Sequence, residues 1–260
     1  MSRPIVLTAL LAGAVALATP LAAQETRFTH ALGRGETLSL SNIDGNISVT
    51  PASGRTAEII ARKTVRKGNG ALVKAVMEES SDGIRICTLY LDDTDDDRTS
   101  CTGRRDRNRS RTRDPLDVEM AYEVRLPEGA ALQVATVDGD VHVSDLTGKA
   151  TITTVDGDVI VSGRAPESIS TVDGDIDVTM AEMPKAGMNY RTVDGGITVR
   201  VPSGVGLDVA GSSVDGKFSS DFPLTTAGKW GPRQFRGTLG DGGPALRLST
   251  VDGAIRLQKR

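Results

Sequence analysis

Aspartates recur through the second half of this 260-residue chain in a phrase that could bind a cation. The phrase is Thr-Val-Asp-Gly, often followed by a second Asp. If the copies stack as neighbouring strands, equivalent carboxylates lie about 4.8 Å apart and repel one another. Ca²⁺ accepts several carboxylate oxygens in flexible geometry. The pattern therefore suggests a cation-binding ladder of Asp138, Asp140, Asp156, Asp158, Asp173, Asp175 and Asp194.

A structural interpretation of the same aspartates competes with the Ca²⁺ hypothesis. Each Asp can be a solvated turn residue whose carboxylate accepts hydrogen bonds from nearby backbone N–H groups. The Gly-Gly-x-Gly-x-Asp pattern of Ca²⁺-binding β-rolls is absent from the sequence. No cofactor other than Ca²⁺ is suggested by any motif.

Arginines form a second group that could do chemistry, in an insert over residues 92–115. The insert opens with an acidic block and continues with Arg104, Arg105, Arg107, Arg109, Arg111 and Arg113. Clustered guanidinium groups bind phosphate and carboxylate well, so we expect either a polyanion-binding patch or a solvated charged loop. The lack of aromatic residues between the arginines argues against nucleic acid.

Catalysis is disfavoured by the way the aspartates repeat. Polysaccharide-active enzymes need paired acids in one groove, whereas these residues recur identically from copy to copy. His142 is the one histidine of the repeats, at a position that other copies fill with Ile160 or Asp177. The sequence predicts a protein that is not an enzyme.

The N-terminus and the cysteines predict export. Residues 1–23 have a positive start, an apolar run and small residues before Gln24, as secretory signal peptides do. An uncleaved anchor is the alternative, although the run is short for a membrane span, and no later stretch is apolar enough to cross a bilayer. We expect a periplasmic or cell-surface protein in which Cys87 and Cys101, the only cysteines, form a disulfide.

The spacing of the repeats predicts the architecture. Successive copies from Asp138 to Asp215 are 17 to 21 residues apart, and a weaker copy surrounds Asp44. Such a period is typical of a solenoid, in which each unit stacks on its neighbour. We therefore expect a β-solenoid over residues 131–260 that continues from an irregular or sandwich-like N-terminal β region over residues 24–130.

Each repeat consists of an incoming strand, a Val-Asp-Gly corner and an outgoing strand. We expect the Gly to adopt positive φ, the Asp to bond to the backbone of the turn, and the Val to fill the coil. The predicted turn glycines are Gly45, Gly139, Gly157, Gly174, Gly195, Gly216 and Gly253.

Two long segments resemble a known family. They are VEMAYEVRLPEGAALQVATVDGDVHV, from residue 118, and QFRGTLGDGGPALRLSTVDGAIRL, from residue 234. They are similar to the bacterial putative-adhesin family, and the resemblance extends over about residues 36–258. It implies an exported β-solenoid domain of unknown function at the cell envelope, with no catalytic residues to carry over.

These observations together predict an all-β solenoid with a non-catalytic role. Its repetitive surface would bind an envelope glycan or a surface protein, or serve as a scaffold. Two alternatives stay open: a polysaccharide-active enzyme built on a β-helix, and a structural or stress-signalling envelope component without a ligand of its own.

Overall fold

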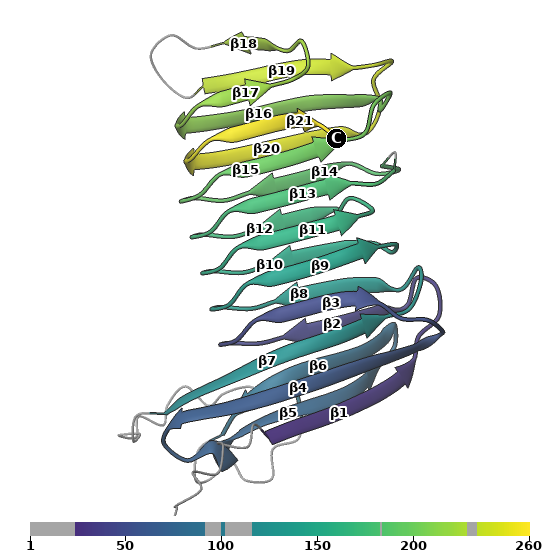
Figure 1. Cartoon of the computed structure of the whole chain (residues 1–260), viewed down its shortest axis with the longest axis vertical. Coiled ribbons are helices and arrows are strands. Elements are labelled where there is room, and N and C mark those ends of the chain that lie inside the picture. Colours follow the sequence, from purple (N-terminus) through teal and green to yellow (C-terminus); the bar gives the residue numbers. More distant parts are fainter. Residues whose placement is uncertain (1–23, 92–99, 102–115, 183, 228–232) are drawn as a thin grey trace, which may run out of the picture.

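The computed structural model describes residues 24–91, 100–101, 116–182, 184–227 and 233–260. Within these residues the chain is almost entirely β and forms an elongated stack of coils (Figure 1). Each coil contributes one strand to each of two sheets, which we call sheet A and sheet B. None of the residues described forms a helix with the length and apolar character needed to span a lipid bilayer. The predicted β-solenoid class is confirmed.

Sheet A contains ten strands within the described residues. In spatial order they are β1 (Gln24–Ala31), β4 (Thr56–Lys67), β7 (Asp117–Leu126), β3 (Ile47–Pro51), β9 (Val141–Leu146), β11 (Val159–Gly163), β13 (Ile176–Met180), β15 (Ile197–Val201), β21 (Ile255–Lys259) and β17 (Phe218–Ser220). From β7 to β17 neighbouring strands pair parallel, whereas β4 pairs antiparallel with both β1 and β7.

Sheet B contains eleven strands within the described residues. In spatial order they are β18 (Thr225–Ala227), β19 (Arg233–Leu239), β16 (Leu207–Asp215), β20 (Ala245–Asp252), β14 (Met188–Arg191), β12 (Ser168–Ser170), β10 (Ala150–Thr153), β8 (Ala131–Ala135), β2 (Thr37–Ser41), β6 (Gly83–Tyr90) and β5 (Val73–Ser80). A 3₁₀ turn, η1 (Gly70–Leu72), precedes β5.

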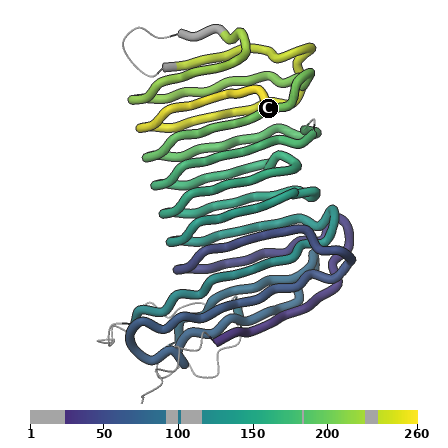
Figure 2. Tube along the Cα trace, viewed as in Figure 1, coloured from purple at the N-terminus to yellow at the C-terminus, as the bar shows by residue number. Residues whose placement is uncertain are grey.

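The order of coils in space departs from the order in sequence at both ends. The coil of β2 and β3 lies directly beside that of β8 and β9, so both sheets run without a break across residue 131. At the other end, the C-terminal coil of β20 and β21 lies between β14–β15 and β16–β17. Figure 2 shows this C-terminal coil in yellow, between green coils that precede it in the chain.

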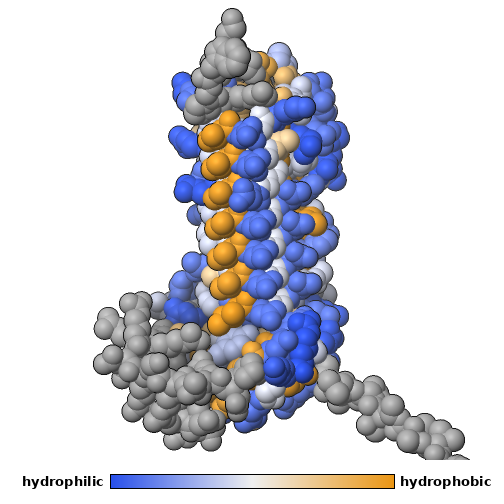
Figure 3. Space-filling view, turned by 90° about the vertical axis from the view of Figure 1, so that its left-hand side faces the viewer, coloured by the Kyte–Doolittle hydropathy of each residue, from blue (hydrophilic) through white to orange (hydrophobic). Residues whose placement is uncertain are grey.

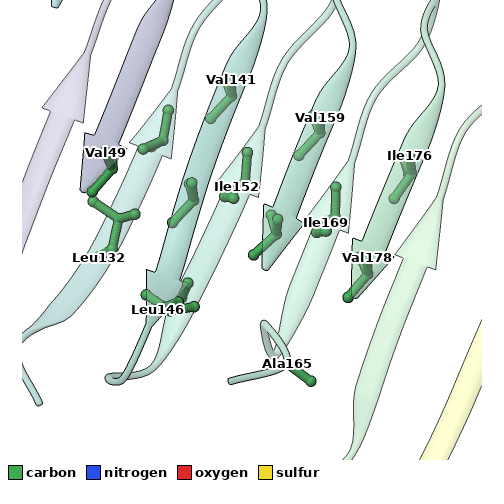
Figure 4. Packing of buried hydrophobic residues seen from close by; sticks show 14 of the residues in the cluster. Val49, Leu132, Val141, Leu146, Ile152, Val159, Ala165, Ile169, Ile176 and Val178 are labelled. Carbon is green, nitrogen blue, oxygen red and sulfur yellow. The ribbon is translucent and has the colours of Figure 1, made fainter. Parts of the chain in front are cut away.

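The core is a set of apolar columns between the two sheets. Val141, Val159 and Ile176 are register partners on consecutive strands of sheet A, and Ile152 and Ile169 are partners in sheet B (Figure 4). All five are buried, whereas the residue that follows each of them on its strand points outward. Burying each such side chain contributes about 1.5–3 kcal/mol, so the stacking of coils supplies the stability that no single coil has.

The N-terminal end carries the predicted disulfide. Cys87 on β6 is bonded to Cys101, with a Cα–Cα separation of 5.8 Å, which confirms the pairing. A small apolar cluster of Cys87, Leu89 and Leu91 packs beside the bond. The predicted signal peptide and most of the charged insert lie outside the described residues.

Candidate functional site

The Thr-Val-Asp-Gly copies form one continuous column along the corner between the sheets. Isolated bridges join Asp44 to Asp138 and then each copy to the next as far as Asp252, whose partner on β16 is Asp215. Backbone bonds repeat with the same pattern, for example from Gly157 N to the Asp173 carbonyl at 2.9 Å. Seven corners are therefore in register, and each type of residue in the motif forms its own column.

The threonines of the motif stabilise the corner from inside the coil. They are buried, and in the later copies their hydroxyls bond to carbonyls of the adjacent corner, as from Thr192 Oγ1 to the Gly174 carbonyl at 3.0 Å and from Thr250 Oγ1 to that of Gly195 at 2.9 Å. The Thr136 hydroxyl has no hydrogen-bond partner among the described residues. In the first coil the side-chain amide of Asn42 takes over this role by donating to the carbonyls of Gly45 and Met120. The recurrence of Thr before each Val-Asp-Gly could have indicated this role.

The corner glycines have positive φ, as predicted, at six of the seven copies. The exception is Gly216. The close approach of neighbouring coils is a second reason for glycine at these positions. A Cβ on Gly174 would lie 2.2 Å from the Gly157 carbonyl oxygen, and a Cβ on Gly216 would lie 1.8 Å from the Gly253 carbonyl oxygen. Any larger residue would push neighbouring coils apart.

At the three corners that have a second aspartate, this residue bonds to the backbone of the next coil. Asp140 Oδ1 accepts from the backbone N–H of Asp158 at 2.9 Å, and Asp158 Oδ1 accepts from that of Asp175 at 2.7 Å. Asp175 Oδ1 continues the series with the N–H of Gly196 at 2.6 Å. We expected the first aspartate to bond to the backbone, and that expectation was wrong: the bonds lie between coils and involve the residue after the glycine.

The first aspartates point into solvent. Among the described residues, no hydrogen bond or ion pair engages the carboxylates of Asp138, Asp156, Asp173, Asp194 or Asp252. At the first coil, burial raises the pKa of Asp44, and the charge of Asp138 raises it further. The described residues contain no group of three or more His, Cys, Asp or Glu side chains arranged to hold a metal ion. Ca²⁺ binding by these columns stays a hypothesis beside the interpretation of the aspartates as solvated turn residues.

The valines of the motif form an exposed apolar column. We expected them to fill the coil, but the structure places them outside, with 39–55% of their surface exposed. Figure 3 shows the column in orange along the molecule, beside a blue hydrophilic column. We call the two columns together the corner face. Its valines are Val137, Val155, Val172, Val193, Val251 and Val214, and its aspartates are Asp138, Asp156, Asp173, Asp194, Asp252 and Asp215.

The outward turn of the valines has a simple geometric cause. The strand before the corner alternates inward and outward, and the buried Thr takes the inward position that ends this alternation. The next two residues then lie on the outside of the bend, before the glycine turns the chain into the second strand. The alternation of the strands does not extend around the corner, so strand patterning alone could not place the Val.

The other residues singled out from the sequence are not brought together. His142 is exposed on β9, where its register partners are Ser48 and Ile160, neither of which is acidic. The arginines from Arg104 to Arg113 lie outside the described residues, so polyanion binding by the insert stays a prediction.

Comparison with known proteins gives a family and weak structural likenesses. No curated protein matches the chain. A cell adhesion protein of Clostridium sporogenes, described as putative, is 10% identical, with a TM-score of 0.44 and coverage of 91% of this chain and 100% of the other. A putative adhesin of Bacteroides fragilis is 11% identical, with a TM-score of 0.39 and coverage of 91% and 97%. The family model described as Toastrack DUF4097 matches residues 34–258, and the chain therefore belongs to the Toastrack DUF4097 family.

Proposed function

We propose that the chain is an exported, non-catalytic adhesion protein that binds a partner protein through the corner face. The observation that carries the proposal is the column of exposed valines. The Cys87–Cys101 disulfide supports export, because disulfides persist in oxidising compartments.

Folding alone does not account for valine at these positions. The side chain does not fill the coil, and a Ser or Thr would fit the same exposed backbone. Contiguous apolar surface on a soluble protein is unusual and marks interaction sites, whereas scattered exposed valines need no explanation. Here the exposed valines are in register at six consecutive coils.

The charges beside the valines indicate the chemistry of the partner. The first aspartates have no hydrogen-bond or ion-pair partner among the described residues, so the apolar column runs beside an uncompensated negative one. A complementary surface would carry apolar side chains flanked by Lys or Arg, which is the composition of a protein. The lack of aromatic residues on this face makes it a poor platform for sugar rings.

The proposal can be tested with envelope fractions from the producing cell. Purified mature protein would be mixed with peptidoglycan, lipopolysaccharide, capsule and outer-membrane proteins in separate experiments, at low and moderate salt. We expect retention by the protein fraction, weakened by salt because exposed charges are screened. Retention by none of the fractions, or by a glycan fraction alone, would contradict the proposal.

Variants would locate the binding surface. We expect V155S/V172S/V193S to lose retention, and D156N/D173N/D194N to weaken it and reduce its salt dependence. The matched control is I160S, which removes an exposed apolar side chain from the outer face of sheet A. Equal retention of the valine variant and the wild type would show that the corner face is not the site.

A further inference from the structure

A cleft of about 680 Å³ lies on the outer face of sheet B near the C-terminal end of the stack. Its polar lining comes from four neighbouring strands, β19, β16, β20 and β14 (Figure 1). The volume falls within the range of about 300–1,000 Å³ that is typical of small-ligand sites. The polar residues that line it are Asn189, Ser212, Gln234, Arg236, Arg247 and Ser249.

Strand register places two guanidinium groups around a gap. Ala210 on β16 is the register partner of Arg236 on β19 and of Arg247 on β20. The two arginine Cα atoms are thus two strand spacings apart, about 10 Å. Because Ala210 carries only a methyl group between them, the space above it is open to a ligand.

The floor of the cleft is fixed from below. Phe235 is buried under the sheet and stacks on Phe218, with ring centroids 3.7 Å apart. A Cβ on Gly211 would lie 2.1 Å from the Phe235 ring, so the backbone of β16 rests directly on it. The strands that carry the arginines are therefore anchored to the core.

The two arginines are free to bind an anion. Among the described residues, neither Arg236 nor Arg247 has an ion pair or a hydrogen bond from its guanidinium group. Several other arginines on the sheets are paired, such as Arg125 with Glu58 and Arg200 with Asp177. Asp208, the outward acidic residue of β16 two positions before Ala210, accepts a hydrogen bond from Thr238 Oγ1 at 3.1 Å.

Neutral hydrogen-bonding groups lie next to the arginines. Ser212 is the register partner of both Gln234 and Ser249, which gives a row of two hydroxyls and an amide parallel to the row of arginines. Asn189 is the partner of Arg247 on the other side. Guanidinium groups bind carboxylate and phosphate with two parallel hydrogen bonds, and hydroxyl and amide groups suit the hydroxyls of a sugar.

We propose that this cleft binds an acidic glycan, with a carboxylate or phosphate of the sugar held between Arg236 and Arg247. The neighbouring sugar hydroxyls bond to Ser212, Gln234 and Ser249. Single-stranded nucleic acid fits less well, because the aromatic ring at the cleft is buried beneath the sheet and offers no face for base stacking. The site is separate from the corner face and does not depend on its proposed function.

Calorimetric titration of the mature protein tests the proposal. The probes are trigalacturonate, a phosphorylated mannose oligosaccharide, neutral maltotriose and a short oligothymidylate. We expect binding of one or both acidic sugars, weaker at higher salt, and none of maltotriose. The two acidic probes distinguish a uronate from a phosphorylated glycan. Equal binding of maltotriose, equal or tighter binding of the oligothymidylate, or no binding of either acidic sugar would overturn the proposal.

Four variants locate the site. We expect R236Q/R247Q to weaken binding by at least about ten-fold. The substitution A210E keeps both arginines but places a carboxylate between them, so it should block binding equally, whereas A210S should retain it. R256Q/K217Q removes the same charge outside the cleft and should bind as the wild type does. Circular dichroism and melting would confirm that each variant folds.

The outcomes separate this site from the corner face. V155S/V172S/V193S should bind the acidic sugar normally, whatever its effect on retention by envelope proteins. Unchanged binding by R236Q/R247Q, or an equal loss in R256Q/K217Q, would overturn the assignment to the cleft.

Discussion

Each coil of the solenoid turns twice, and the two turns follow different rules. The corner from sheet B to sheet A has five residues in the coils that begin with β8, β10, β12 and β14, with nearly the same residues each time. The opposite turn varies, with residues 147–149, 164–167 and 181–187 joining successive coils. The 21-residue step from Asp173 to Asp194 therefore owes its extra length mainly to the opposite turn, whereas the 17- and 18-residue steps differ in the lengths of their strands.

The difference shows where stacking requires one particular residue. At the corner, the glycine, the threonine and the second aspartate each contact or bond to the adjacent coil, so the same type recurs. At the opposite turn the contacts differ from one coil to the next. One example is Tyr190, whose hydroxyl donates to the Pro166 carbonyl at 3.0 Å. The exposed valines and first aspartates recur at the corner without such bonds, which is why we assign them to binding.

The largest expected effect comes from filling the space between corners. Gly174→Ala adds a Cβ 2.2 Å from a carbonyl oxygen at φ +147, and we expect a loss of at least about 3 kcal/mol in the free energy of unfolding. Gly204→Ala, in the opposite turn, is the control, because φ is +78 but no atom lies within 4 Å. It should cost about 1–2 kcal/mol from backbone strain alone. Urea unfolding measures both, and equal losses would contradict the stacking argument.

The threonine column offers a pair that differs in one bond. Thr192→Val removes a buried hydroxyl that bonds to the Gly174 carbonyl, and we expect a loss of about 1–3 kcal/mol. Thr136 is also buried, but its hydroxyl has no hydrogen-bond partner in the described structure. Thr136→Val should therefore be neutral or stabilising in the same unfolding experiment. A similar loss in both variants would mean that side-chain shape, rather than bonding, sets the corner.

The two aspartate columns should respond differently to the same substitution. Asp158→Ala removes the acceptor for the Asp175 N–H, and we expect a loss of about 1 kcal/mol. Asp156→Ala removes an exposed carboxylate without a bond, so the change should stay within about 0.5 kcal/mol. Thermal melting compares them directly. A larger loss of stability from Asp156→Ala than from Asp158→Ala would show that the first aspartates have a structural role.

The smallest expected effect is that of Ca²⁺. Each second-column carboxylate from Asp140 to Asp175 already accepts a backbone N–H, and the described residues show no metal-holding group. We expect the same melting temperature with Ca²⁺ and with a chelator. A rise with Ca²⁺ that disappears in D156A/D173A would instead establish the cation ladder.

Much of the fold could be predicted from the sequence because the motif repeats. Recurrence of Thr-Val-Asp-Gly at a nearly constant step requires equivalent surroundings for each copy, and stacking provides them. The pairing of Cys87 with Cys101 was also predictable, because the sequence contains no other cysteine. Which residues of the corner are buried, which are exposed and which bond to the next coil was not predictable. That Val137 and Asp138 both face outward follows from the path of the bend and not from strand alternation.

The sequence by itself determined the unit, its strands and its glycine corners, because these follow from local backbone geometry and the period of the pattern. Only the tertiary structure decided the order of the last coils. Equivalent coils present similar surfaces to each other, so chain order does not settle which one lies next to β15, and the C-terminal coil occupies that place. The cleft depends on this choice: Ala210 separates Arg236 from Arg247 because β16 lies between β19 and β20.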